Sequence, residues 1–568
     1  MRRLPSTQRF MWLPTLTALL MIPLATVHAQ QGIDYSISNE FRYGTGERYE
    51  QEVPIGKEYL ENMFNTRVYA GDFTLGFRLE VDKPREYGRD TIGLKEYFGE
   101  FQRDNLRVRG GMFYNLLGRG LLMNTFESRP LGFDTETEGV KIDYRSQDVS
   151  AQAFGGIMNY TDILTFTRTE QYLLRGISGE VHPLKEIGVG GSFMTASGRK
   201  TPSGFTRPFD AYMREAFLDA NYSGLRAYLN YADKRTQLDS ADRARTTSLR
   251  YGYATYGLLG YSNSDVGVTA EYKNYRYDLV EPNEQNASGR ATRALPFQNG
   301  PTLILEHDKT LLARNPHAID FSDELGFQLE TLLYPKDGLT VTLVANGGSR
   351  HNAWQAKLVK DSAGVNKTVY ERINAAPLSF PELKDIRYSP FWEVFAHGEY
   401  EVSDRQTFAI GIQRKDNILY GEGNGDVAPS SETYKASTLM LESISSVGQA
   451  DNLHAILELQ QVYDSKKALP ATDSTAEFDG MYKNVLLTLE YTHSPRWAVN
   501  GRLEWTTTDH EQGGRRLWPV LGATYRIGTA HTVGLQYGAE RGGVVCTGGV
   551  CRLINPFNGV RLTVTSKL

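Results

Sequence analysis

The residues of this chain that could do chemistry are its histidines, its two cysteines and the charged side chains of its alternating segments. The ten histidines are scattered, and none stands beside a serine or a carboxylate at a spacing that specifies a catalytic site. The sequence also contains no glycine-rich phosphate loop and no EF-hand spacing. We therefore expect a protein that is not an enzyme and that has no metal site and no cofactor.

The two cysteines, Cys546 and Cys551, lie close together in the stretch Cys-Thr-Gly-Gly-Val-Cys. In an exported protein, two cysteines at this spacing are expected to form a disulfide, with Gly548 and Gly549 making the turn. A metal site with two thiolates is the alternative, but no histidine lies within this loop to complete it. The disulfide would close a short loop, so its stabilisation would be modest.

A third set of residues consists of charged side chains that alternate with apolar neighbours. Residues 73–82 read FTLGFRLEVD, which places the apolar residues on one face of a strand and most polar residues on the other. The same alternation gives the following charged residues an inward direction: Arg67, Arg78, Glu80, Glu100, Arg107 and Arg109. They could set up a transverse field that steers polar solutes through a constriction. The alternative is a ladder of cross-strand ion pairs that only satisfies a wet interior.

The stretch 113–138 reads FYNLLGRGLLMNTFESRPLGFDTETE and is too apolar for an exposed loop, although it is also charged. A segment with both characters must bury itself against another part of the molecule. We therefore predict that residues 116–138 fold inward and constrict a lumen, with Arg119, Glu127 and Arg129 as the candidate functional residues. The alternative is a loop that packs on the rim for stability alone.

These residues must be positioned by secondary structure, and the sequence predicts a series of antiparallel strand pairs that would do so. Tight turns such as Gly71-Asp72 alternate strictly with long polar segments such as 277–322 and 348–388. Short periplasmic turns and longer extracellular loops are typical of outer-membrane barrels. The sequence predicts an all-β chain that forms a single transmembrane antiparallel β-barrel of about 24 strands, with 22 or 26 as alternatives.

The two ends of the chain are expected to close this barrel. Residues 557–568 alternate with a period of two up to the last residue. An open sheet edge cannot lie in lipid, so we expect 33–43 to pair with 557–567. The candidate closure residues are Ile33, Tyr35, Ile37, Val560, Leu562 and Val564.

Composition agrees with a barrel in a membrane. The mean hydropathy is only −0.42, as expected when lipid-facing residues alternate with polar ones. The counts of 33 Tyr and 25 Phe are high enough to form aromatic girdles at the two membrane interfaces. A net charge of −5 without a strongly basic patch makes nucleic acid an unsuitable partner.

The N-terminal residues predict export. Residues 1–29 contain a basic start, an apolar run and a small-x-small cleavage site at Val27-His28-Ala29, which indicates a signal peptide. A membrane anchor is the alternative, but the apolar run is short and contains two prolines. We expect residues 30–568 to form one barrel domain in the outer membrane of a Gram-negative cell.

Two motifs, GRGLLMN at 118–124 and ERGGVVCTGGVCR at 540–552, resemble an uncharacterised family of Gram-negative outer-membrane β-barrel proteins, a domain of unknown function. The resemblance implies the location and the fold of the whole mature chain, and it transfers no substrate and no catalytic residue. The chain departs from many outer-membrane barrels in ending on Leu568, where they end on an aromatic residue.

The leading functional hypothesis is passage of a small polar solute, by diffusion or after a partner protein opens the barrel. Its partners would be outer-membrane lipids, the solute, and a lipoprotein or periplasmic protein. The rival is a non-conducting scaffold or receptor that binds a partner through its long loops, above all 277–322 and 348–388. The two hypotheses differ in whether inward segments fill the lumen.

Overall fold

The fold is known from a computed structural model. It describes residues 32–50, 53–88, 90–161, 169–200, 207–238, 248–277, 295–320, 322–360, 362, 364–374, 376–421, 429–467, 480–508, 514–547 and 550–568. The predicted signal peptide at 1–29 lies outside these residues.

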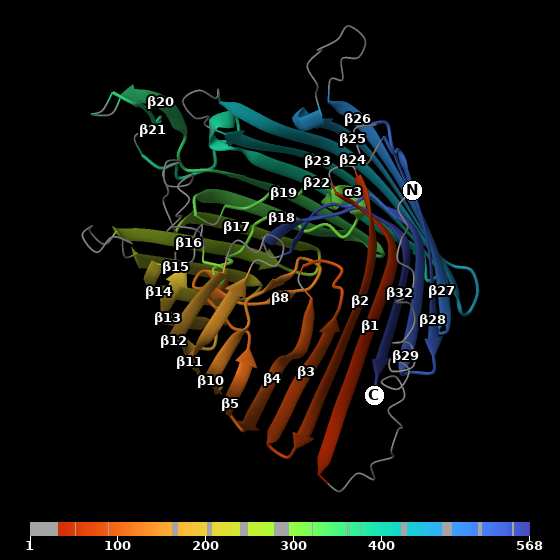
Figure 1. Cartoon of the computed structure of the whole chain (residues 1–568), viewed down its shortest axis with the longest axis horizontal. Helices are drawn as coiled ribbons and strands as arrows, with labels where there is room; N and C mark the ends of the chain where they lie inside the picture. Colours follow the sequence, from red (N-terminus) through yellow and green to blue (C-terminus); the bar gives the residue numbers. More distant parts are fainter. Residues whose placement is uncertain are drawn as a thin grey trace, which may run out of the picture.

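Within these ranges, 24 antiparallel strands join into one sheet that closes on itself, which confirms the predicted fold class (Figure 1). The first twelve strands are β1 (Ile33–Glu50), β2 (Val53–Ala70), β3 (Phe73–Asp82), β4 (Thr91–Arg103), β5 (Leu106–Phe113), β10 (Thr137–Arg145), β11 (Val149–Thr161), β12 (Thr169–Leu184), β13 (Ile187–Lys200), β14 (Arg207–Tyr222), β15 (Leu225–Leu238) and β16 (Ser248–Ser262). The other twelve are β17 (Val266–Arg276), β18 (Glu324–Lys336), β19 (Leu339–Ser349), β22 (Phe391–Ser403), β23 (Gln406–Gly421), β24 (Ser430–Ser446), β25 (Asp451–Asp464), β26 (Met481–His493), β27 (Trp497–Thr506), β28 (Leu517–Ile527), β29 (His531–Glu540) and β32 (Phe557–Lys567).

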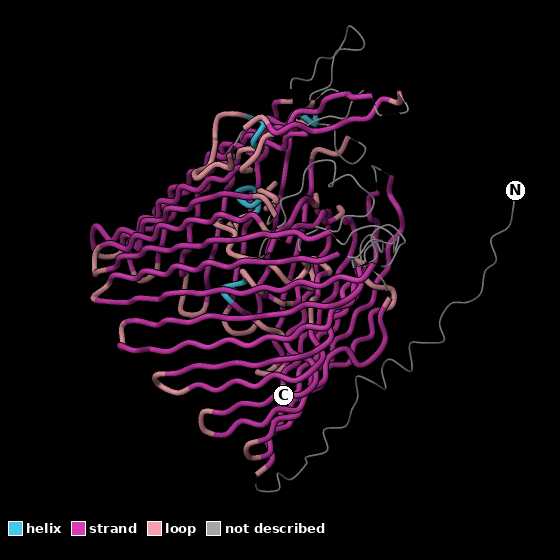
Figure 2. The backbone as a smooth tube through the Cα atoms, turned by 90° about the vertical axis from the view of Figure 1, so that its left-hand side faces the viewer, coloured by secondary structure: helices cyan, strands magenta, loops and turns pink. Residues whose placement is uncertain are grey.

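The connections between these strands hold only short elements. They are β6 (Leu116–Leu117), η1 (Gly118–Gly120), β7 (Met123–Asn124), β8 (Glu127–Ser128), β9 (Phe133–Asp134), α3 (Thr310–Ala313), β20 (Trp354–Lys360), β21 (Asn366–Arg372), η2 (Ile386–Tyr388), η3 (Ser465–Lys467), β30 (Gly543–Thr547) and β31 (Val550–Ile554). Figure 2 shows the short turns gathered at one end of the barrel, on the left of the view. None of the helices in the described ranges is long and apolar enough to cross a membrane.

The strands are inside-out compared with those of a water-soluble protein. In β3, Phe73, Leu75 and Phe77 are exposed on the outer surface, whereas Arg78 and Glu80 are buried on the inner one. An outer surface of apolar side chains avoids contact with water only when lipid covers it. The alternation therefore builds a lipid-facing outer wall and a polar inner wall.

Strands β1 and β32 close the barrel, and they lie side by side in Figure 1. In this pairing Val560, Leu562 and Val564 lie opposite Thr45, Tyr43 and Phe41. The main chain of Ile37 bonds to that of Leu568, with N···O distances of 2.9 and 2.8 Å. Ile33 and Tyr35 lie beyond this register and pair only with β2. The register is shifted because β1 and β2 extend to Glu50 and Val53, beyond residue 43 where the first strand was expected to end.

The largest apolar core of the described chain lies inside the barrel, against strands β11 to β17. It includes Leu121, Leu122 and Phe297, which come from connections, and Tyr172 and Tyr275, which come from the wall. Connections between strands must therefore enter the lumen.

Candidate functional site

The first inward segment, residues 114–136, leaves the wall after β5 and folds into the lumen, as predicted for 116–138. Two small hairpins, β6–β7 and β8–β9, shape it. Leu117, Leu121, Leu122 and Met123 are buried to 3% exposure or less, which explains why this stretch is too apolar for an outer loop. β8 lies inside the ring of strands in Figure 1.

A second inward segment, residues 295–320, was not predicted. The stretch 277–322 was expected to be a long outer loop, and its described part instead runs through the lumen, where α3 is visible in Figure 1. Its apolar side chains, Leu295, Phe297, Leu303, Leu311 and Leu312, are at most 5% exposed. The same combination of apolar and charged residues that identified 113–138 was present here, and it is the signal that could have predicted this segment.

The two inward segments hold each other through main-chain and amide hydrogen bonds. The N–H of Asn124 donates to the Phe297 carbonyl at 2.7 Å. The side-chain amides of Asn124 and Asn299 each donate to the other residue's carbonyl, at 3.1 and 3.2 Å. The Gln298 amide donates to the Leu121 carbonyl at 3.2 Å. Together the segments form a partition across the lumen.

Arg119 reaches β14 and β15, several strands along the wall from the strands β5 and β10 that flank its own segment. It has a positive φ of 52°, and its guanidinium lies 3.7 Å from the ring centroid of Tyr228 and 3.8 Å from a carboxylate oxygen of Asp219. The Asn230 amide donates to the carbonyl of Gly118 at 3.2 Å. Arg119 therefore fixes the tip of the first inward segment to β14 and β15.

Glu127 and Arg129 bind the near wall. Arg78 meets Glu127 at 2.8 Å, and Arg129 meets Glu80 at 2.9 Å. We call these four residues the latch. Arg78 and Glu80 are at most 8% exposed, so these ion pairs are largely shielded from water. Burial raises the pKa of Glu127, and Arg78 opposes this shift.

The remaining predicted wall residues, Arg67, Glu100, Arg107 and Arg109, lie together in a separate place. They line a polar cavity of about 810 Å³ near the short-turn end of β2 to β5. Arg107 and Arg109 share Glu100, at 3.0 and 3.6 Å. Among the described residues, Arg67 has no carboxylate within ion-pair distance. Glu100 thus pairs with two guanidinium groups, and the lining of the cavity also contains Arg103, Asp72 and Asp104.

The second inward segment is anchored to strands far along the chain. Main-chain N–H groups of Leu311 and Leu312 donate to Glu458 at 2.7 and 3.2 Å. Arg314 forms a two-pronged pair with Glu504, at 2.5 and 3.1 Å. Further anchoring pairs are His307–Glu393 at 2.6 Å and Lys309–Glu442 at 3.1 Å. Sequence spacing could not reveal these pairs, because most partners lie about a hundred residues apart or more.

Cys546 and Cys551 lie directly opposite each other in the β30–β31 hairpin. Their side chains lie outside the described part of the structure, so the disulfide stays a prediction. Among the side chains that are described, no group of three or more His, Cys, Asp or Glu could hold a metal ion.

We expect Gly120→Ala to separate the two inward segments. Gly120 has φ of +95°, and a Cβ there would overlap the carbonyl oxygen of Asn299. The backbone strain alone should cost at least about 1 kcal/mol. Hydrogen exchange should quicken in 114–125 and around 299. Gly110→Ala is the matched control, since its Cβ would meet nothing within 4 Å; equal exchange in both variants would contradict the prediction.

Comparison with known proteins identifies one family and several solved structures of low similarity. The model of a family of unknown function (DUF6029) matches residues 13–350 and 411–568. No curated protein matches the chain. Among solved structures, the siderophore receptor PirA from Pseudomonas aeruginosa has 9% identity and a TM-score of 0.43, covering 94% of this chain and 80% of PirA. The transporter YddB from Escherichia coli has 8% identity and a TM-score of 0.39, covering 95% and 81%. Likeness at this level says nothing about what this chain binds.

Proposed function

The chain belongs to the DUF6029 family, and we propose that it is an outer-membrane barrel that passes a polar solute when the first inward segment leaves the wall. The latch carries this proposal. It joins a single connection to the inner face of β3 through ion pairs. Removing charges from water offsets much of what such pairs gain, so their net contribution is small and water or a solute can replace them.

Polar space reaches the first inward segment from the short-turn end. A cavity of about 530 Å³ is lined by Leu116 and Leu117 of the segment. It shares Gln102, Asp104 and Arg107 with the cavity of about 810 Å³. Displacement of the segment would extend this space along the lumen. The larger cavity is lined by four arginines and three carboxylates, and this surplus of one positive charge favours an anionic solute.

The test is the conductance of the purified barrel in a planar bilayer. We expect no steady current from the intact chain. Replacing 116–134 with a short Gly-Ser linker should open a steady current that prefers chloride to potassium, because the arginine cluster then lines the path. A cation preference would contradict the assignment of an anionic solute.

The matched control replaces 355–371, the β20–β21 hairpin, with the same linker. This hairpin is another long connection, and it stands clear of the barrel in Figure 1. Its removal should leave the barrel silent. Silence of both variants, with both barrels folded, would reject the gated path.

A non-conducting receptor is the second candidate, and the β20–β21 hairpin is the observation that favours it. The hairpin and its flanks expose Leu358, Val365 and Ile373 at 46%, 61% and 38%. Exposed apolar side chains on a projecting hairpin suit an external or lipoprotein partner. Under this candidate the partition only braces the wall, and neither deletion above would conduct.

A further inference from the structure

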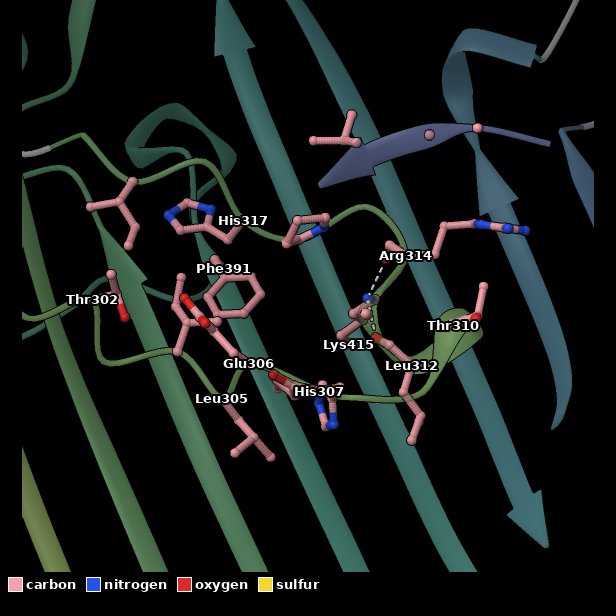
Figure 3. Close-up of a pocket in the computed structure, with 18 residues that line it drawn as sticks. Thr302, Leu305, Glu306, His307, Thr310, Leu312, Arg314, His317, Phe391 and Lys415 are labelled. Atoms are coloured by element: carbon pink, nitrogen blue, oxygen red, sulfur yellow. Dashed lines mark hydrogen bonds and ion pairs between the residues drawn. The ribbon is translucent and has the colours of Figure 1, made fainter. Parts of the chain in front are cut away.

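The second inward segment encloses a cavity of about 300 Å³, which is not part of the latch. In Figure 3 the chain passes from Thr302 through His307 to Leu312 along one side of the cavity. It then turns at Arg314 and returns through His317 along the other side, while Phe391 and Lys415 come from the wall. This volume lies at the lower limit of small-molecule pockets.

The cavity has a firm frame. Glu458 and Glu504 hold α3 and Arg314 from β25 and β27. The Lys273 ammonium donates to the Thr302 carbonyl at 2.6 Å and fixes the other end. A cavity that is formed before its ligand arrives avoids the cost of ordering the site upon binding.

Much of the lining is apolar. Ile304, Leu305, Ile319, Phe391 and Val544 contribute aliphatic or aromatic surface. The Phe391 ring is 3% exposed and stacks on the His317 ring, with centroids 4.6 Å apart. Both ring nitrogens of His317 already face partners, Asn417 and Glu324, so the stacked pair presents mainly its apolar edges to the cavity.

The charges in the lining are unevenly paired. Arg314 pairs with Glu504, which also pairs with Arg541 at 2.9 Å. Glu393 accepts from His307 and Gln413, both at 2.6 Å. Lys415 differs, because its ammonium donates only to two main-chain carbonyls, those of Leu312 at 3.0 Å and Arg314 at 2.5 Å. The ammonium also lies 5.9 Å from the ring centroid of Tyr434.

Lys415 is therefore a buried cation without a bonded anion. It is 3% exposed, and no carboxylate of the described chain lies within 4 Å of its Nζ. An ammonium has three N–H donors, and the two carbonyls satisfy two of them. Glu393 lies opposite Lys415 in the β22–β23 pairing and attracts it through space, but its carboxylate already accepts from His307 and Gln413. An anion that accepts the third N–H of the ammonium would therefore be stabilised by a charge-assisted hydrogen bond. Glu306, the other carboxylate of the lining besides Glu393, is exposed, and solvent screens its charge.

We propose that this cavity binds a small amphipathic anion, with its carboxylate on the Lys415 ammonium and its apolar body against Phe391, Leu305 and Ile319. The binding does not require the barrel to conduct. A silent barrel would therefore leave this site standing, and an empty site would leave the gated path standing.

Fluorine NMR on the full chain in lipid nanodiscs tests the site, with para-fluorophenylacetate as the anion and para-fluorophenylacetamide as its neutral match. The wild type should bind the acid at least about tenfold more tightly than the amide, as a charge-assisted hydrogen bond predicts. Lys415→Met should abolish this preference. Equal binding of acid and amide by the wild type, or no binding of either, would overturn the proposal.

Lys234→Met is the matched control. Lys234 is an equally buried wall lysine, and it contacts the same inward segment through Gln298 at 2.9 Å, outside the cavity. This variant should keep the preference for the acid. If Lys415→Met disturbs the second inward segment, Phe391→Leu is a second variant that tests the same site. Phe391→Leu should lower the affinities for the acid and for the amide by the same factor, so that the ratio of the two affinities stays as in the wild type. Loss of the preference for the acid in Phe391→Leu or in Lys234→Met would overturn the assignment to Lys415.

Discussion

Replacing Arg129 with methionine is expected to release the first inward segment from the barrel wall. Arg129 lies 2.9 Å from Glu80, 3.6 Å from Asp82 and 3.7 Å from Glu61. These three carboxylates are at most 5% exposed. Removing one partner of a buried ion pair costs about 3–5 kcal/mol, because the remaining charges stay buried with less compensation. Because the wall cannot move, we expect the first inward segment to detach from it.

Hydrogen exchange of residues 114–136 measures this release. The opening equilibrium of the segment should rise roughly a hundredfold or more, while the barrel strands stay protected. The double variant Arg129→Met/Glu80→Gln should recover part of the protection, because it removes one of the uncompensated charges. Protection that stays at the wild-type level in Arg129→Met would show that apolar packing alone holds the segment.

Arg107→Met is the control for the loss of an arginine as such. Arg107 faces the same lumen and pairs with Glu100 at 3.0 Å, but it is 46% exposed. An ion pair that water can reach contributes little. Exchange in 114–136 should therefore be unchanged in this variant, and a release equal to that of Arg129→Met would assign the effect to the lumen charge and not to the latch.

The barrel could be predicted from the sequence because its signal is local. The alternation in 73–82 is complete within one strand, and the turn at Gly71-Asp72 follows directly from its residue types. Because one face of each strand meets lipid and the other meets water, most hairpins show the alternation of apolar and polar residues. The pairing of β1 with β32 followed from the need to remove both edges, although its register did not.

The partition could be predicted only in part. The apolar stretch 113–138 indicated burial, and the strand alternation directed Arg78 and Glu80 into the lumen. These two residues lie 49 residues from their partners Glu127 and Arg129, so the pairs themselves could not be predicted. The second segment was missed because its partners lie on other strands: Arg314 and Glu504 are 190 residues apart. No local pattern connects such residues. In the sequence Lys415 resembles any other lysine of a strand. Only the structure shows that it donates to the carbonyls of Leu312 and Arg314.

Docking of the first inward segment is expected to weaken as the pH rises, through Glu136. Burial raises the pKa of this carboxyl from its ordinary 4.5 to about 8, helped by Asp134 and Glu96 and opposed by Lys95 and Arg78. Glu136 is 9% exposed, and its Oε1 has no hydrogen-bond partner among the residues that are described. The docked state thus favours the protonated acid, whereas the released segment ionises near pH 4.5.

The direction of this pH dependence follows from which state of the segment binds the proton. Below pH 4.5 both states hold the proton, so Glu136 has no effect on docking. Between pH 4.5 and 8 only the docked state holds it, so docking weakens by roughly 1.4 kcal/mol per pH unit. Above pH 8 the loss is complete. Hydrogen exchange of 114–136, corrected for its intrinsic pH dependence, should show this slope, and Glu136→Gln should flatten it at the strongly docked level.

Glu138→Gln is the matched control for Glu136→Gln, because Glu138 lies two residues further on and is exposed. Its replacement should leave the slope of the wild type in place. The same slope in Glu136→Gln would assign the pH dependence to another group, with Glu127 of the latch as the next to test, since burial raises its pKa as well. Loss of the slope in Glu136→Gln alone would identify a single carboxyl through which pH controls docking of the first inward segment.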